Sequence, residues 1–259
     1  MKLLCVVAAG LLATLASASA QAQFRLGGGV EYFTWSENTT PSVDETGPLL
    51  ALHLGYLQPK PRGLLFGYAG RLYFGDVDYE GATLSPPFMP LASTTRYTGM
   101  SNEAQLRYRL PPSRGYWLDF TGALGLDVWR RELSSTQKED WRVGYLRLGV
   151  DLDTPADRGF VLGAGFKYPF YTWEDAHFTS LGFDRNPTLE PGKEWSVYAQ
   201  VGYRFRRNWQ VIGYMDSFRF NDSNYEFLVS SNPALPSGLY GQPQSTMYTW
   251  GVKLEYLFR

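Results

Sequence analysis

Residues 248–258 read Tyr248-Thr249-Trp250-Gly251-Val252-Lys253-Leu254-Glu255-Tyr256-Leu257-Phe258, and this stretch decides the fold. Its apolar and aromatic residues occupy every second position from Tyr248, whereas Lys253 and Glu255 fall between them. Successive side chains of a β-strand point to opposite faces, so the pattern predicts a strand with one apolar face and one polar face. Aromatic residues at the ends of the apolar face indicate a boundary with lipid.

Nine further stretches of the chain alternate in the same way. Together the ten predict an all-β fold, a single up-and-down antiparallel transmembrane β-barrel of ten strands joined by short turns and long loops in alternation. Bacterial barrels place short turns in the periplasm and long loops outside, and an even strand number leaves both termini periplasmic. We therefore predict a protein of the bacterial outer membrane. The predicted strands are 24–36, 48–58, 63–76, 97–110, 115–131, 140–152, 159–173, 194–205, 208–220 and 246–258.

The connections between these strands alternate in length. Loops 77–96 and 221–245 are the largest, and the second is rather apolar for a solvated segment. Because binding residues concentrate on loops held by a rigid scaffold, we expect these two loops to contact any extracellular ligand. The predicted long loops are 37–47, 77–96, 132–139, 174–193 and 221–245, and the predicted turns are 58–62, 111–114, 153–158 and 206–207.

The first 22 residues read as a secretory signal peptide, cleaved at about residues 20–22. Lys2 supplies the positive start, and residues 3–15 form an apolar run too short for a spanning helix. We expect residues 23–259 to form the outer-membrane barrel domain, with a retained anchor helix as the alternative. Cys5 is the only cysteine, so its loss with the leader would exclude disulfides, cysteine nucleophiles and thiolate metal sites.

The composition agrees with a barrel. Mean hydropathy is −0.27 although 16% of residues are aromatic, as expected when half of each strand faces a polar interior. The net charge of −1 gives no indication of nucleic-acid binding. Tyr and Trp near strand ends, such as Tyr32, Trp35 and Trp129, are typical of membrane-interface belts. The alternative is a soluble β-sandwich or lipocalin-like barrel, which would place Leu124 inside and Arg107 in solvent.

The face opposite the apolar one is predicted to line the interior. Its charges balance, whereas an ion-selective pore usually carries an excess of one sign. A ten-stranded barrel is narrow and buried charges need partners, so we expect an interior occluded by ion pairs, with a small-solute pore as the alternative. We interpret His53 as a polar partner inside the barrel. The predicted interior charges are Arg25, Arg71, Arg107, Arg109, Arg147, Lys167, Arg204 and Lys253, and Glu31, Glu103, Asp119, Asp127, Asp151, Asp153, Asp216 and Glu255.

Several aromatic and glycine patterns resemble the proteobacterial outer-membrane β-barrel proteins, a large family of mostly uncharacterised members. The resemblance covers essentially all of the predicted barrel domain and implies an integral outer-membrane barrel. The patterns are Tyr73-Phe74-Gly75-Asp76-Val77-Asp78-Tyr79-Glu80-Gly81, Tyr97-Thr98-Gly99 with Glu103 and Tyr108, and Trp250-Gly251-Val252-Lys253-Leu254-Glu255-Tyr256.

A more distant resemblance is to the omptins, ten-stranded outer-membrane proteases. The stretches Asp76-Val77-Asp78 and Asp175-Ala176-His177 are similar to the Asp-x-Asp and Asp-x-His pairs of that family. The resemblance implies a catalytic site in which His177 is the general base and Asp175 fixes its tautomer, while Asp76 and Asp78 hold a water. Extending the strand patterns places Asp175 and His177 on the inner face. The same extension places Asp76 and Asp78 on the outer face unless a bulge intervenes.

We thus predict a non-enzymatic integral barrel with an occluded, charge-paired interior, acting through its surface loops in adhesion, ligand contact or envelope structure. The alternatives are an omptin-like endopeptidase and a small-solute pore. The expected partners are outer-membrane lipids, lipopolysaccharide and the barrel-assembly machinery, the last through the strand that ends at Phe258. With two histidines and no Asp-rich calcium-loop spacing, the sequence predicts no metal site and no cofactor.

Overall fold

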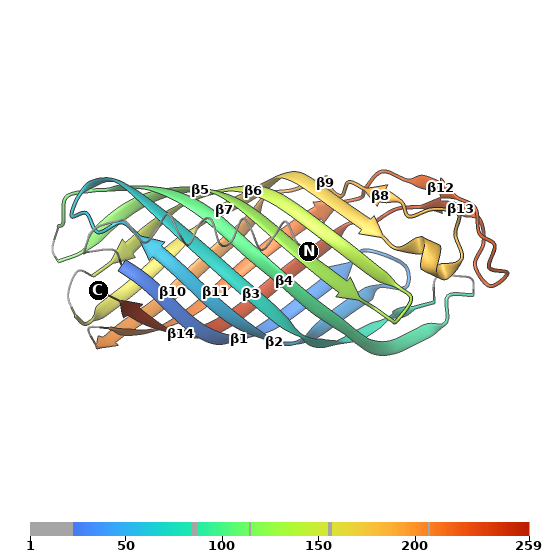
Figure 1. Cartoon of the computed structure of the whole chain (residues 1–259), viewed down its shortest axis with the longest axis horizontal. Helices are drawn as coiled ribbons and strands as arrows, with labels where there is room; N and C mark the ends of the chain where they lie inside the picture. Colours follow the sequence, from blue (N-terminus) through green and yellow to red (C-terminus); the bar gives the residue numbers. More distant parts are fainter. Residues whose placement is uncertain (1–22, 84–86, 114, 155–156, 207, 259) are drawn as a thin grey trace.

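The computed structural model describes residues 23–83, 87–113, 115–154, 157–206 and 208–258, so the predicted leader lies outside the described residues. Ten long antiparallel strands form a closed barrel, which confirms the predicted fold class (Figure 1). Each barrel strand pairs with the next along the chain, and β1 pairs with β14 to close the cylinder. The barrel strands are β1 (Gln23–Glu37), β2 (Val43–Leu57), β3 (Gly63–Ala82), β4 (Pro90–Arg109), β5 (Trp117–Glu132), β6 (Lys138–Asp153), β7 (Gly159–Ala176), β10 (Ser196–Arg206), β11 (Trp209–Asn221) and β14 (Ser245–Phe258).

The two longest connections carry short elements of their own at one end of the barrel, which we call the long-loop end (Figure 1). The other end, where β1 begins and β14 ends, is the turn end. Among the described residues, no helix is long and apolar enough to cross a membrane. The short elements are the 3-10 helix η1 (Phe178–Leu181), β8 (Thr188–Leu189), β9 (Gly192–Lys193), β12 (Glu226–Leu228) and β13 (Gly238–Tyr240).

The prediction of a loop at residues 77–96 is wrong for most of that range. It forms a hairpin extension of the barrel, in which β3 and β4 stay paired as far as Ala82 and Pro90. Val77 still points inward there, but the outward residue Asp78 is polar and exposed. The apolar-out pattern that marks a lipid-facing strand is therefore lost, although the strand itself continues.

The outer surface of the barrel is apolar and the interior is charged, the reverse of the soluble alternative. Leu124 is 60% exposed and Leu254 is 46% exposed, whereas the Arg107 and Lys253 side chains are only 11% and 17% exposed. An apolar surface of this extent needs lipid to cover it. We call this surface the apolar band; it includes Leu26, Leu52, Leu72, Leu124, Leu148, Phe166, Val201, Val252 and Leu254.

A β-bulge interrupts β7 opposite β6. The register shifts between Gly144 and Tyr145, so that Gly144 lies opposite Tyr171 and Tyr145 lies opposite Pro169. Proline has no amide hydrogen to donate to the ladder, and bulges concentrate at barrel rims. Beyond the bulge the inward and outward positions of β7 are exchanged, which places Glu174 inside.

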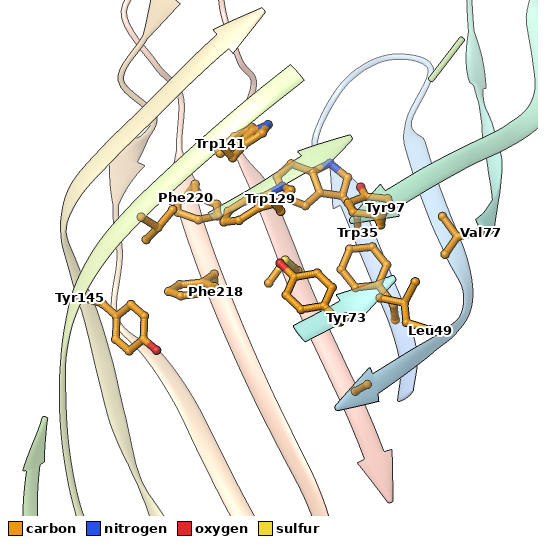
Figure 2. Packing of buried hydrophobic residues seen from close by; sticks show 14 residues of the cluster. Trp35, Leu49, Tyr73, Val77, Tyr97, Trp129, Trp141, Tyr145, Phe218 and Phe220 are labelled. Carbon is orange, nitrogen blue, oxygen red and sulfur yellow. The ribbon is translucent and has the colours of Figure 1, made fainter. Parts of the chain in front are cut away.

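Toward the long-loop end the interior is filled by stacked aromatic rings (Figure 2). Trp129 and Trp141 stack with ring centroids 5.2 Å apart, and Trp35 meets Trp141 edge-on at 5.2 Å. Their exposures are 2%, 0% and 0%, so Trp35 and Trp129 belong to the interior and the prediction that they form an interface belt is wrong. Tyr32 is 54% exposed, because its position has the opposite parity to Trp35. The aromatic layer consists of Phe33, Trp35, Tyr73, Tyr97, Trp129, Trp141, Tyr145, Phe218 and Phe220.

Inward-facing glycines make room for several of these rings. The Tyr145 ring lies directly against Gly125, its register partner on β5, where a Cβ atom would overlap the ring. Tyr73 occupies the same relation to Gly99 on β4. The alternating small and large residues let the rings lie flat along the wall and fill the narrow interior.

Candidate functional site

Asp76 and Asp78, two of the four predicted catalytic residues, lie on the outer face of β3. Both are exposed, as the strand pattern without a bulge predicts. Asp76 Oδ1 accepts a hydrogen bond of 2.9 Å from Arg96 on the neighbouring strand. These carboxylates therefore belong to the polar outer surface beyond the apolar band.

Asp175 and His177 are also on the outer side, so the prediction that they face the interior is wrong. The bulge in β7 is the reason, because it exchanges the two faces between the middle of the strand and Asp175. His177 Nε2 lies 2.9 Å from Oδ2 of Asp140 on β6. Among the described residues, His177 makes no hydrogen bond and no ion pair with Asp76, Asp78 or Asp175.

Asp140 is the centre of this outer cluster. Arg130 donates two hydrogen bonds of 2.7 Å to its carboxylate, and His177 makes the third contact. Partial burial opposes ionisation of Asp140, but the hydrogen bonds from Arg130 and His177 leave its pKa below the ordinary value. The imidazole is thus occupied by an ion-pair network on the outer wall, beyond the apolar band.

A second charged cluster, which the sequence analysis missed, lies inside the barrel above the aromatic layer. Arg131 donates hydrogen bonds to Glu45 at 2.8 Å, to Glu37 at 2.9 Å and to Glu139 at 3.0 Å. Arg131 is 2% exposed and Glu45 is 0% exposed. We call Arg131 with Glu37, Glu45, Glu139 and Glu174 the rim cluster.

The rim cluster holds more carboxylates than cations. Glu174 is 1% exposed, and its Oε2 atom has no hydrogen-bond partner in the described part of the chain. Within the described residues, no group of three or more His, Cys, Asp or Glu side chains is arranged to hold a metal ion.

The strand pattern contained a signal for the rim cluster. Arg131 continues the inward parity of Asp127 and Trp129 on β5. Glu45 and Glu139 do the same on β2 and β6, but both fell inside predicted loops, where no facing was assigned. Extending each strand by its inward residues alone would have found them.

The sixteen predicted interior charges all point inward, and most are paired. These sixteen charges balance, as predicted, but the rim cluster adds one cation and four carboxylates to the interior. His53 is also inside, with Nε2 3.2 Å from the Tyr214 hydroxyl. The ion pairs are Arg71–Glu31 at 3.5 Å, Arg107–Asp151 at 3.4 Å, Arg109–Asp119 at 2.8 Å, Arg147–Glu103 at 2.8 Å, Lys167–Asp216 at 2.7 Å, Arg204–Asp153 at 3.1 Å and Lys253–Glu255 at 2.8 Å.

The two longest connections pack against each other at the long-loop end. The Tyr240 ring contacts the rings of Phe178 and Phe183, with centroids 5.5 and 4.9 Å away. Beyond this contact, the β12–β13 hairpin exposes Phe227 and its register partner Leu239, which are 56% and 67% exposed. The predicted loop 221–245 therefore contains an ordered hairpin with an apolar outer face.

Comparison with known families decides the class. The model of the outer membrane protein beta-barrel domain matches residues 3–205. The chain belongs to this outer-membrane β-barrel family. The match agrees with the closed barrel, the apolar band and the resemblance drawn from the strand patterns. No curated protein matches the chain significantly.

Solved outer-membrane barrels are similar to this family member at low identity. The outer membrane protease OmpT from Escherichia coli is 14% identical, with a TM-score of 0.48, covering 92% of this chain and 96% of that one. The toluene transporter TodX from Pseudomonas putida is 12% identical, with a TM-score of 0.34 and coverages of 95% and 92%. The β domain of the Bordetella autotransporter BrkA is 11% identical, with a TM-score of 0.39 and coverages of 92% and 100%.

Proposed function

We propose that this outer-membrane barrel does not conduct solutes and acts through its long-loop end, by contact with a ligand or partner outside the cell. The observation that carries the proposal is the aromatic layer. Trp35, Trp129 and Trp141 are almost fully buried across the interior, where a pore would need a polar passage. The rim cluster adds a second barrier above them, because the buried Arg131 is hydrogen-bonded to Glu37, Glu45 and Glu139.

The β12–β13 hairpin and the hairpin extension of β3 and β4 both support a function at the long-loop end. Phe227 and Leu239 expose apolar surface well away from the apolar band, where lipid would not cover it. Phe88 and Met89, near the tip of the β3–β4 extension, are 45% and 59% exposed. Exposed apolar residues rimmed by polar ones are typical of interaction sites.

The sidedness is part of the same proposal. Residues 1–22 act as a cleaved signal, both ends of the barrel domain are periplasmic, and the long-loop end is extracellular. The pairing of β1 with β14 supports it, since Phe24 lies opposite Phe258 at the turn end. The strand that ends at Phe258 is offered to the barrel-assembly machinery, and lipopolysaccharide surrounds the outer half of the apolar band.

A conductance measurement tests the closed interior. We expect purified protein in planar bilayers to give no steady unitary current, because the aromatic layer leaves no polar path. Trp129→Gly and Trp141→Gly open the aromatic layer only, so steady current steps should appear when Arg131→Gly is added to these two substitutions. Trp250→Gly is the matched control, because Trp250 is 55% exposed on the outer face. Steady unitary steps from the unaltered protein would contradict the proposal.

The omptin-like endopeptidase is tested by peptide cleavage. We expect no turnover of a dibasic peptide by refolded protein with lipopolysaccharide present. Asp76 pairs with Arg96 and His177 is hydrogen-bonded to Asp140, in separate places on the outer face. Cleavage that disappears in His177→Ala would establish the protease and overturn this expectation. Asp140→Asn tests the hydrogen bond to His177. If it abolished such an activity as well, Asp140 would belong to the catalytic site.

A further inference from the structure

Below the aromatic layer, the interior contains a polar cavity of about 140 Å³. Cavities of this size hold a molecule as large as benzene when they are apolar. This one is lined by charged and hydroxyl-bearing side chains, so apolar ligands are excluded and a polar occupant is required. The side chains that carry the following argument are Arg25, Arg71, Arg107, Tyr198 and Lys253.

Arg25 is the cation of the lining that lacks a partner. Arg107 pairs with Asp151 at 3.4 Å, and Lys253 pairs with Glu255 at 2.8 Å. Within the described part of the chain, Arg25 makes no hydrogen bond and no ion pair. Glu255 attracts Arg25 only at longer range, because its carboxylate is paired with Lys253 and accepts a hydrogen bond from Gln210.

Further donors of the lining have no acceptor. Nε of Arg25, Nε of Arg71 and the hydroxyl of Tyr198 are buried and have no hydrogen-bond partner among the residues that the structure describes. The same is true of one acceptor, Oδ1 of Asp216. Buried polar groups in native proteins are almost always satisfied by protein, water or ligand. The excess of donors over acceptors, together with an unneutralised guanidinium, indicates an occupant that accepts hydrogen bonds and carries negative charge.

We propose that the cavity binds a small oxyanion of the phosphate, sulfate or carboxylate class, held chiefly by Arg25. A guanidinium presents paired N–H groups that fit two oxygens of such an anion, and a hydrogen bond to a charged group is stronger than one to water. The carboxylates of the lining do not repel the anion strongly, because each is neutralised by its own cation. The site is independent of the function proposed for the long-loop end.

Calorimetric titration of the purified full-length protein in detergent with inorganic phosphate tests the site. We expect saturable binding of one phosphate per chain, weakened at least about tenfold in Arg25→Gln. Arg62→Gln is the matched control, because Arg62 is exposed in the turn between β2 and β3, and its binding should equal that of the unaltered protein.

Two results would overturn the site. One is the absence of saturable phosphate binding by the unaltered protein, and the other is equal binding by Arg25→Gln. Arg25→Lys provides a second variant if Arg25→Gln does not refold, and it should bind more weakly than the unaltered protein because an ammonium lacks the paired donors. Competition by sulfate or acetate in the same cell supports the oxyanion class; chloride competing equally well would refute it.

Discussion

Replacing Arg131 with Met is expected to lower the free energy of unfolding by about 3–5 kcal/mol at neutral pH, the usual cost of removing one partner from a buried ion-pair network. Arg131 is the cation that Glu37, Glu45 and Glu139 share. Without it, these carboxylates remain buried with hydrogen bonds only from neutral groups, such as the Thr95 and Tyr97 hydroxyls that donate to Glu45.

The destabilisation by Arg131→Met should shrink as the pH falls. Glu139 carries no charge once it is protonated, so it then no longer needs the Arg131 guanidinium that neutralises it. Urea unfolding of the refolded protein at several pH values, followed by tryptophan fluorescence, measures the effect. Tryptophan fluorescence reports on the substituted site itself, because the Arg131 guanidinium lies over the buried Trp35 ring, 5.3 Å from its centroid.

Arg130→Met is the matched control for that measurement. Arg130 is the preceding residue on the same strand, but it points outward and pairs with Asp140 while 47% exposed. Exposed ion pairs contribute about 0–1 kcal/mol, so this variant should be nearly as stable as the unaltered protein. Equal destabilisation by the two substitutions would show that the rim cluster does not stabilise the barrel.

Replacing Leu124 with Arg is expected to cost about 2–4 kcal/mol in a lipid bilayer, the range for a cation near the middle of a barrel wall. Leu124 is 60% exposed on the outer face of β5, within the apolar band. The cost arises from transferring a charge into hydrocarbon, so it should be smaller in detergent micelles, where water reaches the side chain more easily. Reversible unfolding from liposomes in denaturant measures the difference.

Thr94→Arg provides the comparison for the lipid-facing variant. Thr94 also points outward, but it lies on β4 opposite Asp78 and beyond the apolar band. An arginine there remains in water beside a carboxylate, so its effect should be within about 0.5 kcal/mol of zero. If Leu124→Arg were equally harmless in the bilayer, the apolar band would not be a lipid-facing surface.

The alternation of residue types was enough to predict the architecture, because the facing of a strand residue is a local property. Once Leu254 is outward, Lys253 must be inward, and the same parity correctly assigned the interior charges and His53. The relation holds only while the strand is unbroken. Parity continued through Asp76 and Asp78, but the apolar outward face that marks a strand was lost where the hairpin leaves the membrane, so 77–96 was predicted as a loop.

Which inward residues contact one another became clear only from the closed barrel. Glu45 and Arg131 are 86 residues apart in the sequence, and their contact depends on the tilt and register of the strands that separate them around the barrel. The bulge beside Pro169 had an equally non-local consequence, since it turned Asp175 outward and brought Glu174 into the rim cluster. The alternation along one strand shows whether a side chain points inward or outward. A site also depends on how several strands are shifted along the barrel axis relative to one another, and that register is set only when the barrel closes.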